Sequence, residues 1–136
     1  MPEAKSAREK TKERHRRALI EATADAIAEH GLGQVSISRI LEKAGLSRGM
    51  VNLHFYSKNN LLLAVAQQFS EDYTSHWIVA MEGAGSRAEA RLRAIIDADF
   101  DPVVLNRRTM AVWFAFRGEA DRKSTRLNSS HQIISY

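Results

Sequence analysis

Apolar side chains recur along most of the chain at spacings of three and four residues, the period of an amphipathic α-helix. The first such stretch ends at Gly31 and Gly33. Its stripe consists of Leu19, Ile20, Thr23, Ala26 and Ile27. Thr23 is the polar member, but its methyl group can still pack. No segment shows the alternation of a β-strand, and the sequence predicts an all-α fold.

Two short helices with a glycine between them follow the first stripe. Ser36 is a suitable N-cap for a helix over 37–44. Gly45 breaks that helix, and Ser47 is in position to cap a second one over 48–55. The pattern predicts two helices joined by a tight turn.

The remaining elements are longer. A helix is predicted from Ser57 to the glycines at 83 and 85, and the capping-box pattern of residues 86–89 opens another. A last helical stretch is predicted around 110–116. Residues 1–10 are polar and charged and are expected to form a flexible arm.

Composition narrows the class of protein. The chain has 136 residues, of which 44% are hydrophobic, and it contains no cysteine. Disulfides and thiolate metal sites are therefore excluded. No apolar run approaches the roughly 20 residues of a membrane-spanning helix. The charged N-terminus does not resemble a signal peptide, so a cytoplasmic protein is expected.

Positive charge is concentrated in the first half of the chain. Residues 1–60 carry 11 basic and 7 acidic side chains, whereas residues 61–120 carry 6 and 8. The first half is the part that would attract a polyanion such as nucleic acid. A merely solvated basic surface is the alternative.

Residues 36–55 have the spacing of a helix-turn-helix DNA reader. The first helix must pack on the body and the turn must be tight, which Ile40, Ala44, Gly45 and Leu46 provide. The second helix must offer short or polar side chains to the major groove. Residues with that chemistry are Ser47, Arg48, Gly49, Met50 and Asn52. A plain helical hairpin has the same spacing and remains open.

Residues 46–55, followed by Ser57-Lys58 and Leu61-Leu62, resemble the N-terminal domain of tetracycline-repressor-type bacterial regulators. The resemblance extends over about residues 11–82. It implies a DNA-binding head over 11–60 and part of a ligand-binding and dimerising body over 61–120.

The resemblance also implies roles for the predicted recognition helix. Ser47 would cap it and touch phosphate, and Arg48 would reach a base edge, since arginine binds guanine bidentately. Met50 would contact a thymine methyl, and Asn52 a base or a phosphate. Gly49 would let the backbone approach DNA closely.

Four further residues are implied to bind the DNA backbone. His54 stands where many members of the family have a phosphate-binding tyrosine, and it can also donate to phosphate. Lys58 matches the family's phosphate-binding lysine at a helix start. Ser36 and Arg39, at the start of the preceding helix, are the other two.

Residues 91–95, 100–101 and 110–116 resemble a narrower group, the choline-responsive repressors of glycine betaine synthesis. That resemblance implies an effector pocket in which Trp113 and Phe116 would bind a quaternary ammonium through cation–π contacts. Aromatic residues at this spacing more often form core, which is the alternative. The implied partners are operator DNA, a choline-like effector and a second copy of the full-length chain.

The last sixteen residues differ from the rest. Residues 121–131 are the translation, without a mismatch, of a common sequencing adapter. We expect 121–136 to be adapter-derived, without the helical rhythm of the preceding residues, and the body to be truncated. A truncated chain would be largely monomeric, would bind its operator weakly and would show no choline-dependent release from it.

Other functions have less support. The histidines are scattered without metal-ligand spacing, and no nucleophile, base and orienting group occur together. We therefore expect no enzyme activity, no cofactor and no metal site. A small helical protein-interaction module without a DNA role is the rival hypothesis.

Overall fold

The structure, a computed structural model, describes residues 4–134, with side chains as far as residue 123. Helices account for most of these residues, and none of them lies in a strand, which confirms the all-α prediction. The elements are α1 (Ala7–His30), the short 3₁₀ helix η1 (Leu32–Gln34), α2 (Ile37–Ala44), α3 (Gly49–Phe55), α4 (Lys58–Gly83), α5 (Ala88–Asp99) and α6 (Arg107–Ile134).

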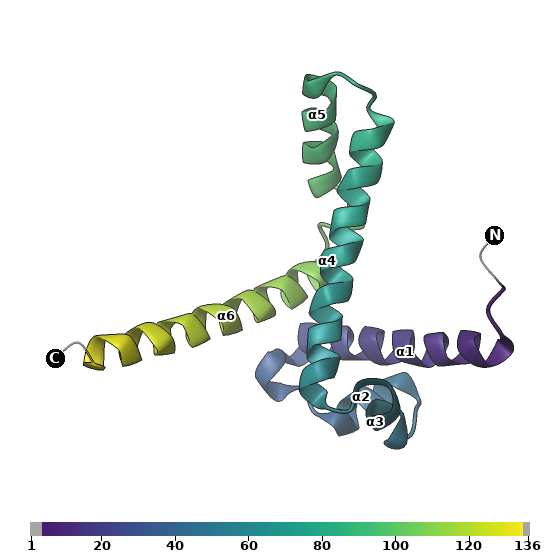
Figure 1. The fold of residues 1–136 in the computed structure, drawn as a ribbon, viewed down its shortest axis with the longest axis vertical. Coiled ribbons are helices and arrows are strands. Elements are labelled where there is room, and N and C mark those ends of the chain that lie inside the picture. Colours follow the sequence, from purple (N-terminus) through teal and green to yellow (C-terminus); the bar gives the residue numbers. More distant parts are fainter. Residues whose placement is uncertain (1–3, 135–136) are drawn as a thin grey trace.

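The helices form a head from which one long helix rises (Figure 1). α1, α2, α3 and the first part of α4 make up the head. α4 then leaves the head, and α5 runs back along its upper part. α6 packs on α1 near the base of α4 and projects to one side. No helix of the described residues is long and apolar enough to cross a bilayer.

One apolar core holds the head together. The predicted stripe of α1 lies in it, with Leu19 and Ile27 buried. The buried hydroxyl of Thr23 donates to the carbonyl of Leu19 at 2.6 Å, so its polar atom is satisfied. The core continues along α4 as far as Phe69 and receives Val112 from α6. The base of α4 and the first turns of α6 are thereby fixed to the head.

The turn between α2 and α3 has the geometry that the glycine predicted. Gly45 adopts a left-handed conformation with φ 64°, which an L side chain would strain. The N–H of Leu46 then donates to the carbonyl of Leu41 at 3.2 Å and closes the end of α2. At the start of α2, the Ser36 hydroxyl accepts the Arg39 N–H at 3.3 Å, as predicted.

Two other predicted helix starts are wrong by one or two residues. α3 begins at Gly49 without a side-chain cap, and Ser47 contributes its backbone carbonyl to the Met50 N–H instead of its hydroxyl. α5 is flanked by Arg87, which makes no capping bond, so Ser86 lies one position too early to form the expected box.

A capping box does occur at the start of α1. Ser6 and Glu9 satisfy each other's backbone N–H groups, and the helix begins at Ala7. The hydrogen bond from the Ser6 backbone N–H, together with the Ser6 hydroxyl, lowers the pKa of the Glu9 carboxylate. The arm expected over residues 1–10 is therefore helical from Ala7 onward.

α6 continues far beyond the stretch predicted at 110–116. The helix runs to Ile134, so the expected loss of helical structure after residue 120 is wrong. The physical reason is composition: residues 121–134 contain no proline and no glycine that would end a helix already started. Their adapter origin is a separate matter and stays a prediction.

Candidate nucleic-acid interface and effector cavity

α3 is anchored on one side and free on the other. Val51 and Phe55 are buried in the head core, at 3% and 5% exposure. The opposite side carries Arg48, Gly49 and Asn52, all exposed. A short helix held in this way presents the side chains of its first turn to a groove.

Ser47 and Met50 flank this exposed side. Ser47 is exposed in the turn before α3, and Met50 is half-buried at the edge of the core. The structure therefore places all five residues predicted for the recognition helix at one end of α3. Met50 is the least accessible of them.

The starts of α2 and α4 frame the recognition helix. Ser36 and Arg39 are exposed, and a guanidinium nitrogen of Arg39 donates to the Gln34 carbonyl at 3.2 Å. This bond holds the side chain near the start of α2 and leaves other guanidinium N–H groups available for a phosphate.

The start of α4 is built onto the end of α3. Ser57 caps α4 by accepting the Asn60 N–H at 3.1 Å, and the Asn60 amide donates to the Phe55 carbonyl at 2.9 Å. Lys58 is the first helical residue and is half-buried. A lysine beside the free N–H groups of a helix start is a site for an anion.

His54 does not join the exposed residues. Both of its ring nitrogens are buried and have no hydrogen-bond partner, and its ring meets that of His15 edge-on at 6.2 Å between centroids. Burial and the nearby charges of His15, Lys12 and Arg16 lower its pKa. In this conformation the ring of His54 packs α3 against α1, and its contact with a phosphate stays a prediction.

Tyr56 is a residue that the sequence reasoning missed. It joins α3 to α4 with φ 66°, a conformation uncommon outside glycine, and it is 83% exposed. Tyr56 stands two residues before Lys58 at the junction that leads into α4, and its exposed hydroxyl can donate to a phosphate. An aromatic residue directly after buried Phe55, in the junction between two helices, was the available signal.

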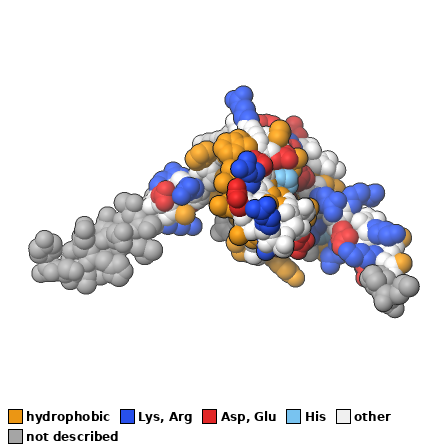
Figure 2. All heavy atoms as spheres, turned by 90° about the horizontal axis from the view of Figure 1, so that it is seen from above, with side chains coloured by type: hydrophobic (Ala, Val, Ile, Leu, Met, Phe, Trp, Pro, Cys, Tyr) orange, Lys and Arg blue, Asp and Glu red, His pale blue; other side chains and the backbone are white. Residues whose placement is uncertain are grey.

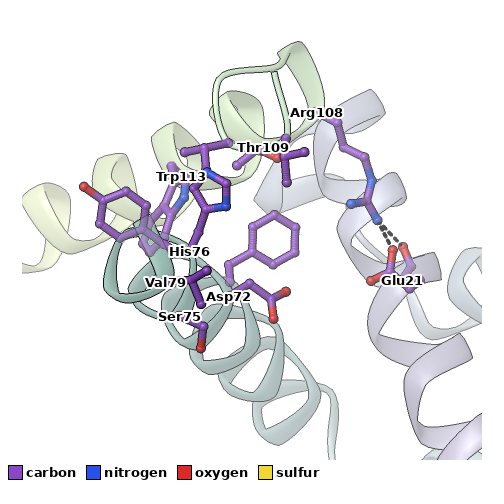
Figure 3. A pocket seen from close by; sticks show the side chains of 12 residues that line it. Glu21, Asp72, Ser75, His76, Val79, Arg108, Thr109 and Trp113 are labelled. Atoms are coloured by element: carbon purple, nitrogen blue, oxygen red, sulfur yellow. Dashed lines mark hydrogen bonds and ion pairs between the residues drawn. The ribbon is translucent and has the colours of Figure 1, made fainter. Parts of the chain in front are cut away.

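A cavity of about 490 Å³ lies where α1, α4 and α6 meet. Figure 3 shows Trp113, His76 and Asp72 facing it from α6 and α4, with Glu21 on the α1 side. Its aromatic lining is Phe69, Tyr73 and Trp113, and its acidic lining is Glu21 and Asp72. Aromatic faces combined with carboxylates suit an organic cation.

The two aromatic residues predicted for the effector do not share this cavity. Trp113 lines it, whereas Phe116 faces a separate depression beside Leu32 and Leu62 and packs against the head core. Phe116 lies about one helical turn further along α6, where its neighbours are Leu62 near the base of α4 and Leu32. Its predicted contact with the effector stays a prediction.

Arg108 joins the cavity to the head. Its guanidinium donates to Asp25 at 2.5 Å and to Glu21 at 2.6 Å, and it lies 5.7 Å from the ring centroid of Phe69. Burial opposes its charge, but the two carboxylates outweigh burial and raise its pKa. Sequence reasoning had no signal for this link, because its partners are more than 80 positions away.

Within the described residues, no three His, Asp or Glu side chains are grouped so that they could hold a metal ion. Several polar groups that line the cavity are engaged in hydrogen bonds within the protein. The Tyr73 hydroxyl, for example, donates to Asp99 at 2.9 Å, which raises the pKa of Tyr73.

Comparisons with known proteins agree with this geometry. The sequence pattern of the family described as "Bacterial regulatory proteins, tetR family" matches residues 19–65, which span the stripe of α1 through the base of α4. Proteins named HTH-type transcriptional regulator BetI are similar along most of the chain. The Escherichia coli protein is 36% identical over 103 residues, and the Yersinia pestis protein is 37% identical over 105.

These matches cover 74% of this chain and 52% of each relative, so the chain spans about half the length of the curated relatives it matches. Among solved structures, a Streptomyces coelicolor A3(2) protein, SCO7518, is similar with a TM-score of 0.70 and 24% identity. The similarity covers 87% of this chain and 68% of that protein, whose structure is described as that of a transcriptional regulator. It shows a shared fold.

Proposed function

We propose that the chain, whose residues 19–65 match the tetR family of bacterial regulatory proteins, is a cytoplasmic, sequence-specific DNA-binding repressor rather than an enzyme. The observation that carries this proposal is the exposed first turn of α3, with Arg48 and Asn52 outward while Val51 and Phe55 are buried beneath them. Such a helix can enter a major groove without disturbing the core.

Base reading is assigned to α3. Arg48 donates to the two acceptors of a guanine edge, and Asn52 to a base or a phosphate. Met50 contacts a thymine methyl, Ser47 contacts the phosphate before the helix, and Gly49 permits close approach of the backbone. The half-burial of Met50 limits its contact to the end of its side chain.

Backbone contacts are assigned to the flanking helices. Lys58 and the first N–H groups of α4 bind one phosphate, and Ser36 with Arg39 at the start of α2 binds another. These contacts fix the register of α3 in the groove and carry no sequence information themselves.

Selection of binding sites from a random duplex library tests the proposal. The chain should enrich a defined sequence, and a footprint should cover it. The rival reading, a protein-interaction module, predicts that no duplex is enriched. Binding that is equal for every duplex would contradict sequence-specific recognition.

For the effector, the proposal is a choline-like quaternary ammonium in the cavity between α1, α4 and α6. The support is the lining by Phe69, Tyr73 and Trp113 together with Glu21 and Asp72, and the similarity to the BetI proteins. Choline should change tryptophan fluorescence, and Trp113→Leu should remove the change. The neutral isostere 3,3-dimethyl-1-butanol is the control, and an equal response to it would contradict cation recognition.

Operator recognition by a pair of heads needs two copies of α3 about 34–36 Å apart. The chain spans about half the length of its BetI relatives, and we propose that in a chain of their length the remaining body sets that spacing in a homodimer. The 136 residues alone expose apolar side chains on α5 and α6, among them Leu92, Phe100 and Phe114. We expect this chain to sediment as a monomer at micromolar concentration, and to aggregate as concentration rises. A stable dimer would contradict that expectation.

A further inference from the structure

The N-terminal half of α1 projects beyond the head. Every described residue before His15 is exposed, and the first buried residue is Leu19. Figure 1 shows this part of the helix passing α2 and α3 and ending in open space. Figure 2 shows Lys and Arg side chains gathered along it. The core therefore does not explain why the helix is this long.

The projecting segment is strongly basic. Residues 4–17 hold seven Lys and Arg side chains against two Glu, a net charge of +5. Both carboxylates are already engaged, Glu9 with Ser6 and Glu13 with Lys5. In the part of the chain that the structure describes, no ion pair is found for the six remaining basic side chains, Arg8, Lys10, Lys12, Arg14, Arg16 and Arg17.

These basic residues fall on different faces of α1. Arg8, Lys12 and Arg16 follow one another at four-residue spacing and share a face, which we call the basic face. The guanidinium of Arg16 lies 5.2 Å from the ring centroid of Phe55 in α3, so the basic face is turned toward the recognition helix. Lys12 is also near enough to His54 at the end of α3 to lower its pKa. Lys10 and Arg14 lie on the opposite side of the helix.

We propose that the basic face of α1 is a second DNA contact, which binds phosphates flanking the base pairs read by α3. This inference rests on the proposed function and adds to it a site outside the helix-turn-helix. The basic face begins beside the last turn of α3 and leads away from it, so it reaches DNA that α3 does not cover. Its partners are phosphates, because Arg and Lys bind them without regard to sequence.

The proposal makes a quantitative statement about salt. Each phosphate contact releases a counterion and contributes about 0.9 to the slope of log K against log salt concentration. Within the described residues, Arg8 and Lys12 are the two members of the basic face that make no ion pair and no cation–π contact, whereas Arg16 lies against Phe55. Losing both contacts should lower the slope by about two units.

A matched pair of double variants of the full chain provides the test. Arg8→Gln with Lys12→Gln removes two charges from the basic face. Lys10→Gln with Arg14→Gln removes the same two residue types from the opposite face. The probe is a fluorescein-labelled duplex selected by the unaltered chain, in a long form with flanking sequence and in a form trimmed to the selected bases. Anisotropy titrations at several salt concentrations give the slopes.

We expect the first variant to lose about two units of slope on the long duplex and little on the trimmed one. The second variant should keep most of the slope on both. Equal losses of slope for the two variants would show a general effect of charge and would overturn the proposal. No loss of slope for either variant would overturn it as well. Failure of the unaltered chain to select any duplex would overturn the proposed function itself, a distinct outcome.

Discussion

Arg108 and Asp25 lie 83 positions apart in the sequence, yet the Nε of Arg108 donates to a carboxylate oxygen of Asp25 at 2.5 Å. The same guanidinium reaches Glu21, one turn earlier in α1, and rests against Phe69 in the cavity. One side chain of α6 thus touches both the head and the lining of the proposed effector site. A ligand that competes for Glu21 or Phe69 would also loosen α6 from α1.

Replacing Arg108 by Met should lower the free energy of unfolding by about 1 kcal/mol. The figure is small because about a third of the Arg108 side chain and about half of each carboxylate are exposed to water. Urea denaturation measures the change. Arg107→Met is the control, since Arg107 is exposed and makes no ion pair in the described residues. A double-mutant cycle with Asp25→Asn that gave no coupling would contradict the link.

Arg48→Ala should weaken binding to the selected operator by about 1–3 kcal/mol and relax the preference at one base pair. The reason is the loss of two donors to a base edge. Titrations with the selected duplex and with single-base variants of it measure both effects. Arg87→Ala provides the control, because Arg87 is equally exposed but stands before α5, far from α3. Equal losses on operator and random duplex would show that Arg48 contacts only backbone.

Lys58→Ala should behave differently. It should weaken binding to every duplex by a similar factor and reduce the salt slope by about one unit, because the contact is to a phosphate. Arg93→Ala, at an exposed position on α5, removes the same charge at a distance from the head, because α5 runs along the upper part of α4 (Figure 1). If Arg93→Ala reduced the slope as much as Lys58→Ala, the site at the start of α4 would lose its support.

Acid should destabilise the head through His54. Its pKa is lowered in the folded state, so below about pH 6.5 the unfolded chain binds a proton that the folded chain does not. The free energy of unfolding is therefore fully retained above that pH and falls as pH drops toward the lower folded value. Urea denaturation at pH 7.5, 6.5 and 5.5 in the wild type should show the fall, and His54→Gln should reduce it.

Deleting residues 121–136 should lower the helical signal in circular dichroism but leave the melting temperature nearly unchanged. Half of α6 lies beyond residue 120. The described contacts of α6 with the head, through Arg108, Val112, Trp113 and Phe116, all lie before that point. A clear fall in melting temperature on deletion would show that the last residues pack on the molecule.

Local signals in the sequence predicted most of the head. Ser36, Gly45 and Ser57 each act through their nearest neighbours, as a hydroxyl cap or a left-handed turn, so their effect can be read without a structure. The box formed by Ser6 and Glu9 belongs to the same class. Its pattern was visible, and it was overlooked because no apolar stripe follows it for ten residues.

The features that sequence alone did not predict depend on distant neighbours. Whether His54 faces a phosphate or a second helix is decided by where α1 passes, and His15 is 39 positions earlier. Trp113 and Phe116 looked equivalent as aromatic residues, but the helix turns them toward different partners. The length of α6 was missed because polar residues lacking a stripe can still continue a helix that has already formed.

The exposed N-terminal half of α1 should open to solvent faster than the rest of the helix. Beyond the core, this segment is held only by its capping box and by local hydrogen bonds, and isolated helices of such length are marginal in water. Its amide protons should exchange with solvent much faster than those after Leu19, and trypsin should cut first at its lysines and arginines. A bound duplex would neutralise the repulsion among these side chains and slow both processes. Slower amide exchange and slower cleavage of this segment would then indicate DNA binding, while amide exchange in the core stayed unchanged.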